Sequence, residues 1–182
     1  MARVPDLDPA SMTPEQRRIH DEIASTRSGT VRGPFAIWLR QPALADAANR
    51  LGTTLRRSPI DQRLFELMVL IVARHWSAQY EWFAHAKHGV EVGLPHEVME
   101  AIRNNRKPML EREDDRLIYD LVTELNETKT LSQPTYDRAV ALLGLDSLIA
   151  LISAIGFYTM VAIMLNSFDA PVPGGERPLP RA

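Results

Sequence analysis

The stretch RLFELMVLIVARHWSAQYEWFAH, residues 63–85, decides the fold. Its first half places apolar residues at helical intervals, with further apolar residues between them, and this predicts a deeply buried helix. A small break is expected near Trp76 and Ser77, after which helical spacing continues to about Val92. Gly93 then suits the position just past a helix end, where a left-handed backbone is needed. We therefore expect two consecutive helices, the first of them buried.

Helical signals dominate the rest of the chain. TPEQ at residues 13–16 has the pattern of a capping box, and residues 148–165 form an almost wholly apolar run near the end. The glycines and prolines of residues 28–42 predict a loop. Since the sequence has no alternating strand pattern and no internal repeat, we expect an all-α fold with about seven or eight helices.

The length of 182 residues suits one domain. We expect a single all-helical domain over residues 1–168, with a core at 42–168 and an N-terminal helical extension at 1–41. Residues 169–182 are rich in proline and glycine, which predicts an extended or mobile tail.

Composition narrows the functional classes. Twenty-one basic and 23 acidic residues give a net charge of −2, which argues against broad nucleic-acid binding. The absence of cysteine excludes disulfides, thiolate metal sites and cysteine nucleophiles. The N-terminus does not resemble a signal peptide, so we expect a cytoplasmic protein. Residues 148–165 approach the length of a membrane span but lack flanking basic anchors, so we interpret them as a helix of a soluble protein without a membrane partner.

The second half of the opening stretch contains candidate catalytic groups. Glu81 and His85 are four residues apart, so their side chains can meet on one helix face, and Tyr80 lies on the flank. A carboxylate beside an imidazole suits general acid–base work. The same pattern also fits a solvated surface pair of little consequence. His88 is expected to be exposed and inert.

Glu66 and two arginines extend this candidate site. Glu66 lies within an aliphatic run, where burial would raise its pKa and favour proton transfer. Arg63 and Arg74 are candidates for binding a carboxylate substrate, although simple surface solvation is the alternative. A metal site formed by Glu81, His85 and His88, with His75 nearby, lacks the regular, duplicated Glu-x-x-His pattern of helical-bundle metal sites. We therefore expect no metal and no cofactor.

Taken together, these residues resemble the carboxymuconolactone decarboxylase family, which includes the alkyl hydroperoxidase D-like proteins. The resemblance implies an all-helical fold that forms homo-oligomers, often trimers or hexamers, and a small-molecule substrate. It is strong over residues 58–105. The matching residues are Arg63, Glu66, Leu67, Leu70, Ala73, Gln79, Tyr80, Glu81, Trp82, His85, Gly93, Leu94, Pro95, Glu97, Ala101, Ile102 and Arg103.

The peroxidase branch of that family uses a Cys-x-x-Cys pair with a glutamate, a tyrosine and a histidine as a proton relay. The resemblance places the cysteine positions at Ala78 and Glu81, and the relay at Glu66, Tyr80 and His85. Because this chain has no cysteine, thiol-dependent peroxidase activity is excluded.

The decarboxylase branch needs neither thiols nor a cofactor. The resemblance implies loss of CO₂ from a small lactone acid, with His85 or Glu81 as the acid and Glu66 and Tyr80 as tuning or relay groups. Trp38 and Trp82 are then candidates for the walls of an apolar substrate pocket. The alternative is a non-redox oligomeric member of unassigned function, such as a small-molecule binder.

Overall fold

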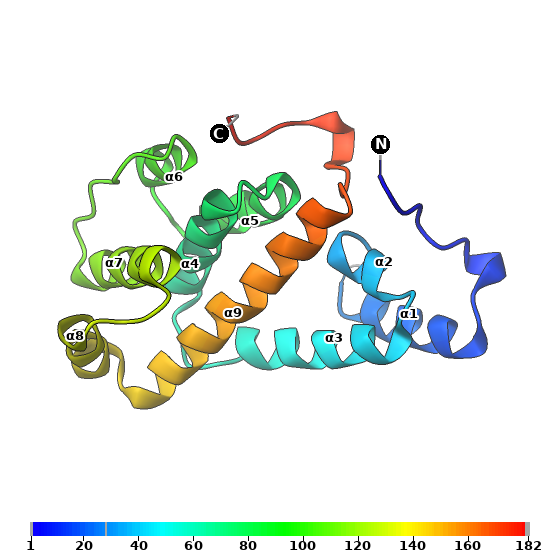
Figure 1. Cartoon of the computed structure of the whole chain (residues 1–182), viewed down its shortest axis with the longest axis horizontal. Coiled ribbons are helices and arrows are strands. Elements are labelled where there is room, and N and C mark those ends of the chain that lie inside the picture. Colours follow the sequence, from blue (N-terminus) through cyan, green and yellow to red (C-terminus); the bar gives the residue numbers. More distant parts are fainter. Residues whose placement is uncertain (1, 28, 181–182) are drawn as a thin grey trace.

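The computed structural model describes residues 2–27 and 29–180, and this part of the chain contains helices and no strand (Figure 1). The all-α prediction is confirmed, although the described residues form nine α-helices rather than seven or eight. Two short 3-10 helices, Pro9–Ser11 and Pro173–Gly175, lie near the ends. The α-helices are α1 (Pro14–Ser25), α2 (Pro34–Trp38), α3 (Pro42–Arg56), α4 (Gln62–His75), α5 (Gln79–Glu91), α6 (His96–Arg103), α7 (Glu113–Thr128), α8 (Gln133–Leu143) and α9 (Leu145–Ser167).

Helix α4 is the centre of the fold, as its apolar sequence predicts. It packs against α5, α6, α7 and α9, and every residue from Leu64 to Ala73 is buried. The side chain of Asp61 caps its N-terminus by accepting hydrogen bonds from the backbone N–H groups of Arg63 and Leu64. A helix that is apolar on all sides is stable only when neighbours cover all of them, which explains this central position.

The predicted break between α4 and α5 is confirmed. Ser77 adopts a left-handed conformation with φ of 50°, and the Ala78 N–H donates to the carbonyl of Ala73 at 2.8 Å. Helix α5 then begins in a new direction along α4. It ends before Gly93, whose φ of 82° is the left-handed conformation expected there. The break therefore sets the direction of the helix that carries the candidate catalytic residues.

The prediction of a loop over residues 28–42 is wrong in its second half, where α2 forms. Pro34 occupies the first turn, in which its missing N–H costs nothing, and the following FAIW segment contains no helix breaker. Phe35 and Trp38 are buried, and their rings meet edge to face at 5.2 Å between centroids. Burial of these two aromatic side chains stabilises a helix too short to persist alone.

Helix α9 crosses most of the molecule diagonally (Figure 1). By length and composition alone it could span a membrane, but half of its most apolar window is buried against the rest of the protein. It contacts α2, α3, α4, α5 and α8, as a core helix does. One side stays uncovered in this single chain. The exposed apolar residues of that side are Leu145, Ile149, Ile152, Met160 and Ile163.

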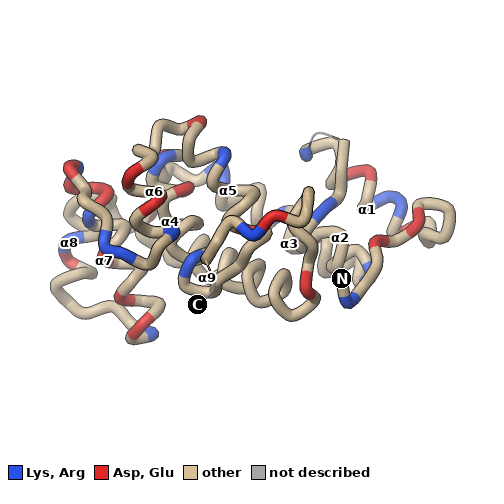
Figure 2. The backbone as a smooth tube through the Cα atoms, turned by 90° about the horizontal axis from the view of Figure 1, so that it is seen from above, with Lys and Arg blue, Asp and Glu red and all other residues tan. Residues whose placement is uncertain are grey.

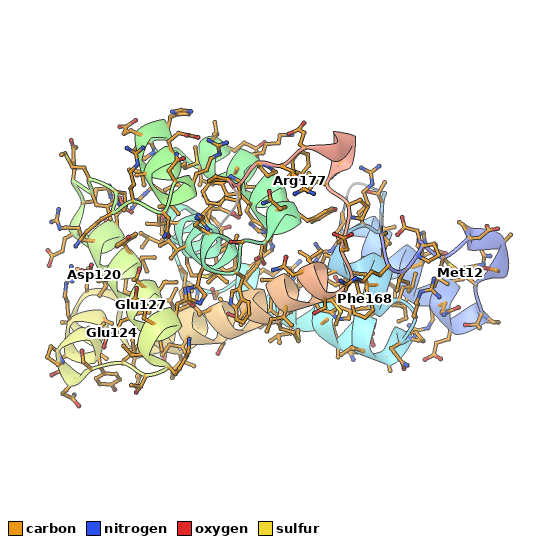
Figure 3. All side chains as sticks on the ribbon, turned by 45° about the horizontal axis from the view of Figure 1, so that its top comes forward. Met12, Asp120, Glu124, Glu127, Phe168 and Arg177 are labelled. Atoms are coloured by element: carbon orange, nitrogen blue, oxygen red, sulfur yellow. The ribbon has the colours of Figure 1, made fainter. Side chains whose placement is uncertain are left out.

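The two terminal segments pack onto the helical body. The Arg3 N–H donates to the carbonyl of Phe168 at 3.0 Å, and Phe168, which is labelled in Figure 3, lies just after α9. Farther along, Leu179 is buried and exchanges two hydrogen bonds with the side chain of Gln79. The tail is therefore extended and docked up to this point. Figure 2 shows acidic and basic residues interspersed along the chain, in keeping with the small net charge.

Candidate active site

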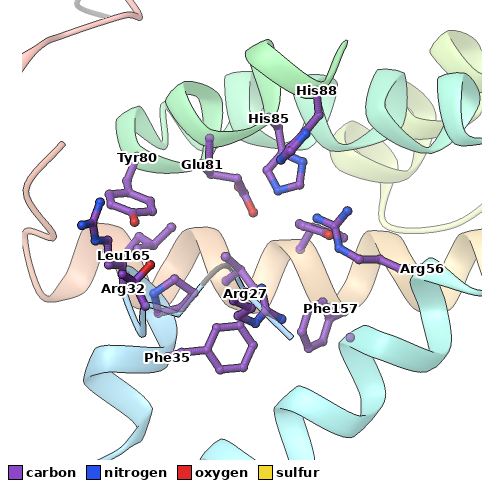
Figure 4. A pocket seen from close by; sticks show the side chains of 16 residues that line it. Arg27, Arg32, Phe35, Arg56, Tyr80, Glu81, His85, His88, Phe157 and Leu165 are labelled. Atoms are coloured by element: carbon purple, nitrogen blue, oxygen red, sulfur yellow. The ribbon is translucent and has the colours of Figure 1, made fainter. Parts of the chain in front are cut away.

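A cavity of about 390 Å³ lies between α5 and α9, and the loop before α2 and one end of α3 complete its walls (Figure 4). Its polar groups come mainly from α5, the α1–α2 loop and α3, while α9 supplies most of the apolar surface. The cavity is lined by Arg27, Thr30, Arg32, Pro34, Phe35, Gly52, Arg56, Tyr80, Glu81, Ala84, His85, His88, Phe157, Tyr158, Val161 and Leu165.

His85 and Glu66 form a buried pair at the wall of this cavity. The Nδ1 atom of His85 lies 2.6 Å from Oε2 of Glu66, and Arg56 approaches the other carboxylate oxygen at 3.5 Å. Glu66 comes from α4 and stands behind His85, which itself faces the cavity. The ring of Tyr158 contacts the imidazole edge to face at 5.1 Å between centroids. The imidazole is therefore fixed in orientation from two sides.

The protonation of this pair follows from its surroundings. Burial lowers the pKa of His85, and the hydrogen bond and charge of Glu66 oppose this only in part. Burial alone would raise the pKa of Glu66, but the hydrogen bond from His85 and the positive charge of Arg56 lower it. A carboxylate and a neutral imidazole result. From the hydrogen bond we assign the imidazole proton to Nδ1, which leaves the Nε2 lone pair free to accept a proton.

Glu81 is in the opposite state. Only 1% of its surface is exposed, and neither carboxyl oxygen has a hydrogen-bond partner among the described residues. Burial raises its pKa well above the ordinary value. Its place in the first turn of α5 favours the carboxylate by about 0.3–1 kcal/mol, whereas burying an unpaired charge costs several kcal/mol. Glu81 therefore holds its proton to a higher pH than an ordinary carboxyl does, and its side chain is directed into the cavity (Figure 4).

Three arginines line the same cavity, and sequence reasoning missed all of them. Arg32 lies beside Tyr80 at one end, Arg56 lies at the other end, and Arg27 lies between them (Figure 4). The Arg27 guanidinium stacks on the Phe35 ring at 4.0 Å from its centroid. Burial and, to a smaller extent, the charge of Arg56 lower the Arg27 pKa. The cavity thus offers positive charge at both ends, which suits an anionic ligand.

Tyr80 lines the cavity at the Arg32 end and not beside the imidazole. Burial raises its pKa, and Arg32 partly opposes this. The ring lies so close to Gly33 that a Cβ atom there would come within 2.6 Å of Cε1. Tyr158, which sequence reasoning did not select, occupies the position against His85. The structure therefore brings Glu66, Glu81 and His85 together and sets Tyr80 apart from the buried pair.

The four residues predicted to bind substrate lie outside this cavity. Trp38 and Trp82 are core residues with 2% and 4% exposure, and neither lines the cavity wall. Trp38 packs behind Phe157, at 6.4 Å between ring centroids, and so supports the wall only indirectly.

The two predicted arginines are engaged elsewhere. Arg63 forms ion pairs with Asp114, at 2.9 Å, and with Asp115. Arg74 donates to the carbonyl of Arg103 at 2.9 Å, and it does not line the cavity. Helical spacing identified them as cations near the candidate site, but it does not reveal which side of α4 faces α7 and which side faces the cavity.

The alternative metal site is not assembled. Among residues 2–27 and 29–180, no group of three or more histidine, aspartate or glutamate side chains is placed to hold a metal ion. His88 turns toward Glu91, with Nδ1 at 3.0 Å from a carboxylate oxygen, and His75 lies exposed at the far end of α4.

The arrangement of helices is the alkyl hydroperoxidase D-like fold, which carboxymuconolactone decarboxylases share, as the sequence resemblance predicts. No protein-family model and no curated protein matches the chain. The structure is similar to that of an uncharacterized peroxidase-related protein from Silicibacter sp. TM1040, with a TM-score of 0.78 and 14% identity over 98% of this chain and 95% of that chain.

Two structures of the debrominase Bmp8 are also similar. A cysteine-to-alanine variant in complex with 2,3,4-tribromopyrrole has a TM-score of 0.72 and 12% identity, over 96% of this chain and 92% of that chain. The apo form has a TM-score of 0.71 and 11% identity, over 95% of this chain and 92% of that chain. At these identities the likeness establishes the fold alone. An enzyme is thus among the proteins with this fold, while the present chain has no cysteine.

Proposed function

We propose that this protein is a cofactor-independent acid–base enzyme acting on a small carboxylated substrate. One observation carries the proposal: Glu81, a carboxyl group with a raised pKa, and His85, an imidazole with a lowered pKa, face one cavity that is lined by arginines. The two groups lie on neighbouring turns of α5, and their pKa values are shifted in opposite directions. Glu81 can therefore act as a proton donor and His85 as a proton acceptor.

The arginines define the substrate as an anion. Arg32 and Arg56 lie at opposite ends of the cavity, so a carboxylate at either end meets a guanidinium (Figure 4). Phe35, Phe157 and Leu165 cover the remaining surface with apolar groups. A volume of about 390 Å³ suits a compact molecule such as a small ring bearing acidic substituents.

The specific reaction proposed is decarboxylation of an unsaturated lactone acid. As the bond to the carboxylate carbon breaks, CO₂ leaves and its electron pair passes through the double bond to the lactone carbonyl, which forms a dienolate. Glu81 then donates its proton to the carbon next to that carbonyl, and solvent returns a proton to Glu81. An arginine offers a hydrogen bond to the developing enolate oxygen, while Glu66 keeps His85 neutral and oriented.

The test is turnover of 4-carboxymuconolactone in D₂O, followed by CO₂ release and by deuterium at the carbon next to the carbonyl. We expect Glu81→Gln to lower the rate by roughly 10²–10⁴-fold, because it removes the proton donor while keeping size and shape. Glu97→Gln, on the exposed surface of α6, is the matched control and is expected to leave the rate unchanged.

Two results would contradict the proposal. Full turnover by Glu81→Gln would show that this carboxyl is not the acid. Tight binding of lactone acids by the wild type without CO₂ release would instead favour a small-molecule binder, which is the alternative function.

We also propose that the protein forms a homo-oligomer, a trimer or a hexamer. The uncovered apolar side of α9 supports this, because Ile149 and Ile163 are 56% and 44% exposed in the single chain. A row of large exposed aliphatic residues on one helix is typical of a surface that another subunit covers.

A further inference from the structure

The cavity continues past Arg56 into a second hollow of about 510 Å³ at the protein surface. Arg27, Arg56 and His88 line both spaces, so the two are continuous. Thr26, Thr53 and Arg57 complete the outer hollow, and no acidic side chain is among its described lining residues. We call this outer space the vestibule. Three guanidinium groups meet there in a protein whose net charge is −2.

Among the described residues these positive charges are neutralised only in part. The Arg57 side chain has no hydrogen bond or ion pair with any residue that the structure describes. Arg27 Nε is buried and has no partner among the described residues, although donors in such positions are usually satisfied. Arg56 reaches only Glu66, at the long distance of 3.5 Å. Burial lowers the pKa of Arg27, and the nearby charge of Arg56 lowers it further.

Helix chemistry explains only part of this cluster. Arg56 and Arg57 lie at the C-terminal end of α3, where basic side chains interact favourably with the helix dipole. That interaction does not require them to face a cavity mouth, and it does not account for the unpartnered Nε atom of Arg27 on another element. A bound anion would satisfy both sets of donors at once.

We propose that the vestibule binds a phosphate group of the substrate while the rest of the molecule extends into the inner cavity. A phosphate monoester carries nearly two negative charges at pH 7 and three terminal oxygens, and planar guanidinium groups bind it through paired hydrogen bonds. A single carboxylate has one charge and two oxygens, too few for Arg27, Arg56, Arg57 and the Thr53 hydroxyl. The inference rests on the proposed function only in taking the ligand to be the substrate, which would then be a lactone acid that also carries a phosphate group.

The experiment is calorimetric titration of the full-length protein with three probes: inorganic phosphate, benzoate and phenyl phosphate. Benzoate tests the inner cavity alone, inorganic phosphate tests the vestibule alone, and phenyl phosphate tests both. We expect phenyl phosphate to bind at least about tenfold more tightly than either of the others, since it combines both sets of contacts.

A surface variant separates the vestibule from the inner cavity. Arg57→Gln is expected to weaken phenyl phosphate about tenfold and to leave benzoate unchanged, because one charge-assisted contact is lost. Arg50→Gln is the matched control: Arg50 lies on the same helix but pairs with Asp46 at 2.9 Å, so neither affinity should change. Thr53→Val should weaken phenyl phosphate by a smaller factor.

Equal affinity of the wild type for benzoate and phenyl phosphate would overturn the proposal, and so would an unchanged affinity of Arg57→Gln for phenyl phosphate. These outcomes are independent of catalysis. Benzoate binding with failed phosphate binding would refute the vestibule and leave the acid–base function standing. Arg57-dependent phosphate binding without turnover of any lactone acid would refute the acid–base function and leave the vestibule standing.

Discussion

The buried carboxyl of Glu81 makes the stability of this protein depend on pH in a direction opposite to that of most acidic residues. Its pKa is raised by burial well above 4.5, so the folded state holds a proton that the unfolded state releases. The stabilising contribution is therefore complete below the unfolded pKa and is lost as pH rises toward the folded pKa. Ionisation of Glu81 opposes folding at every pH between its unfolded and its folded pKa.

The size of the effect follows from linkage. Each pH unit between the unfolded and folded pKa lowers the free energy of unfolding by about 1.4 kcal/mol, because one proton is released on unfolding. The structure offers no compensation, since neither oxygen has a partner among the described residues and only 1% of the residue is exposed. Against a total stability of about 5–15 kcal/mol, such a slope is easily measured.

Other groups in the site act at different pH values, so the comparison must be with Glu81→Gln. His85 has a lowered pKa, and its contribution grows as pH rises toward 6.5 and is constant above that value. Glu66 also has a lowered pKa, and its contribution is lost only in acid. In the difference between the wild type and Glu81→Gln these terms largely cancel, which leaves the Glu81 slope.

The assay is urea unfolding of both proteins at about pH 5.5, 6.5 and 7.5, with the m-values checked for equality. We expect the wild type to lose stability relative to Glu81→Gln by about 1.4 kcal/mol per pH unit until the folded pKa is passed. Parallel stability profiles over this range would refute the reasoning, because they would mean that Glu81 ionises as a solvated carboxyl does.

Three further outcomes are expected. Glu66→Gln should destabilise the protein by about 1–3 kcal/mol in chemical denaturation, because it weakens a buried charge-assisted hydrogen bond; an unchanged midpoint would contradict the pairing. Gly33→Ala should cost more than Gly29→Ala in thermal unfolding, since both have positive φ but only Gly33 would press a Cβ against Tyr80; equal losses would exclude this contact. Ile149→Glu should reduce the sedimentation coefficient by disrupting an oligomer, and a wild type that already sediments as a monomer would refute the proposed assembly.

Most of the fold follows from local patterns in the sequence. The central position of α4 is evident from its continuous apolar run, and the ends of α5 are marked by the break before Ala78 and by Gly93. These signals involve residues close in sequence, where periodicity and backbone preference operate. Helix α2 was not predicted, because its five residues are stabilised by burial of Phe35 and Trp38 against distant parts of the chain.

The candidate site was predictable only in part, for the same reason. Glu81 and His85 lie one helical turn apart, and the aliphatic run around Glu66 identified this residue as a further candidate, which α4 carries to within 2.6 Å of the imidazole. The arginines of the cavity are 25–58 residues away from Glu81 or His85 along the chain and reach the site only through tertiary packing. A basic residue in a glycine-containing loop is too common to identify Arg32 in advance. Spacing pointed instead to Arg63 and Arg74, which face other partners.

The position of Glu81 links the fold to the proposed chemistry. The sequence resemblance aligns it with a cysteine of the thiol-dependent members of the family that the sequence resembles, and it lies in the first turn of α5. A helix N-terminus lowers the pKa of a thiol and so favours a nucleophilic thiolate. A buried carboxyl at the same place behaves differently, because desolvation exceeds the helix dipole and retains the proton. At this position a carboxyl group can donate a proton where a thiolate would donate electrons, and the buried Glu66–His85 pair lies beside it.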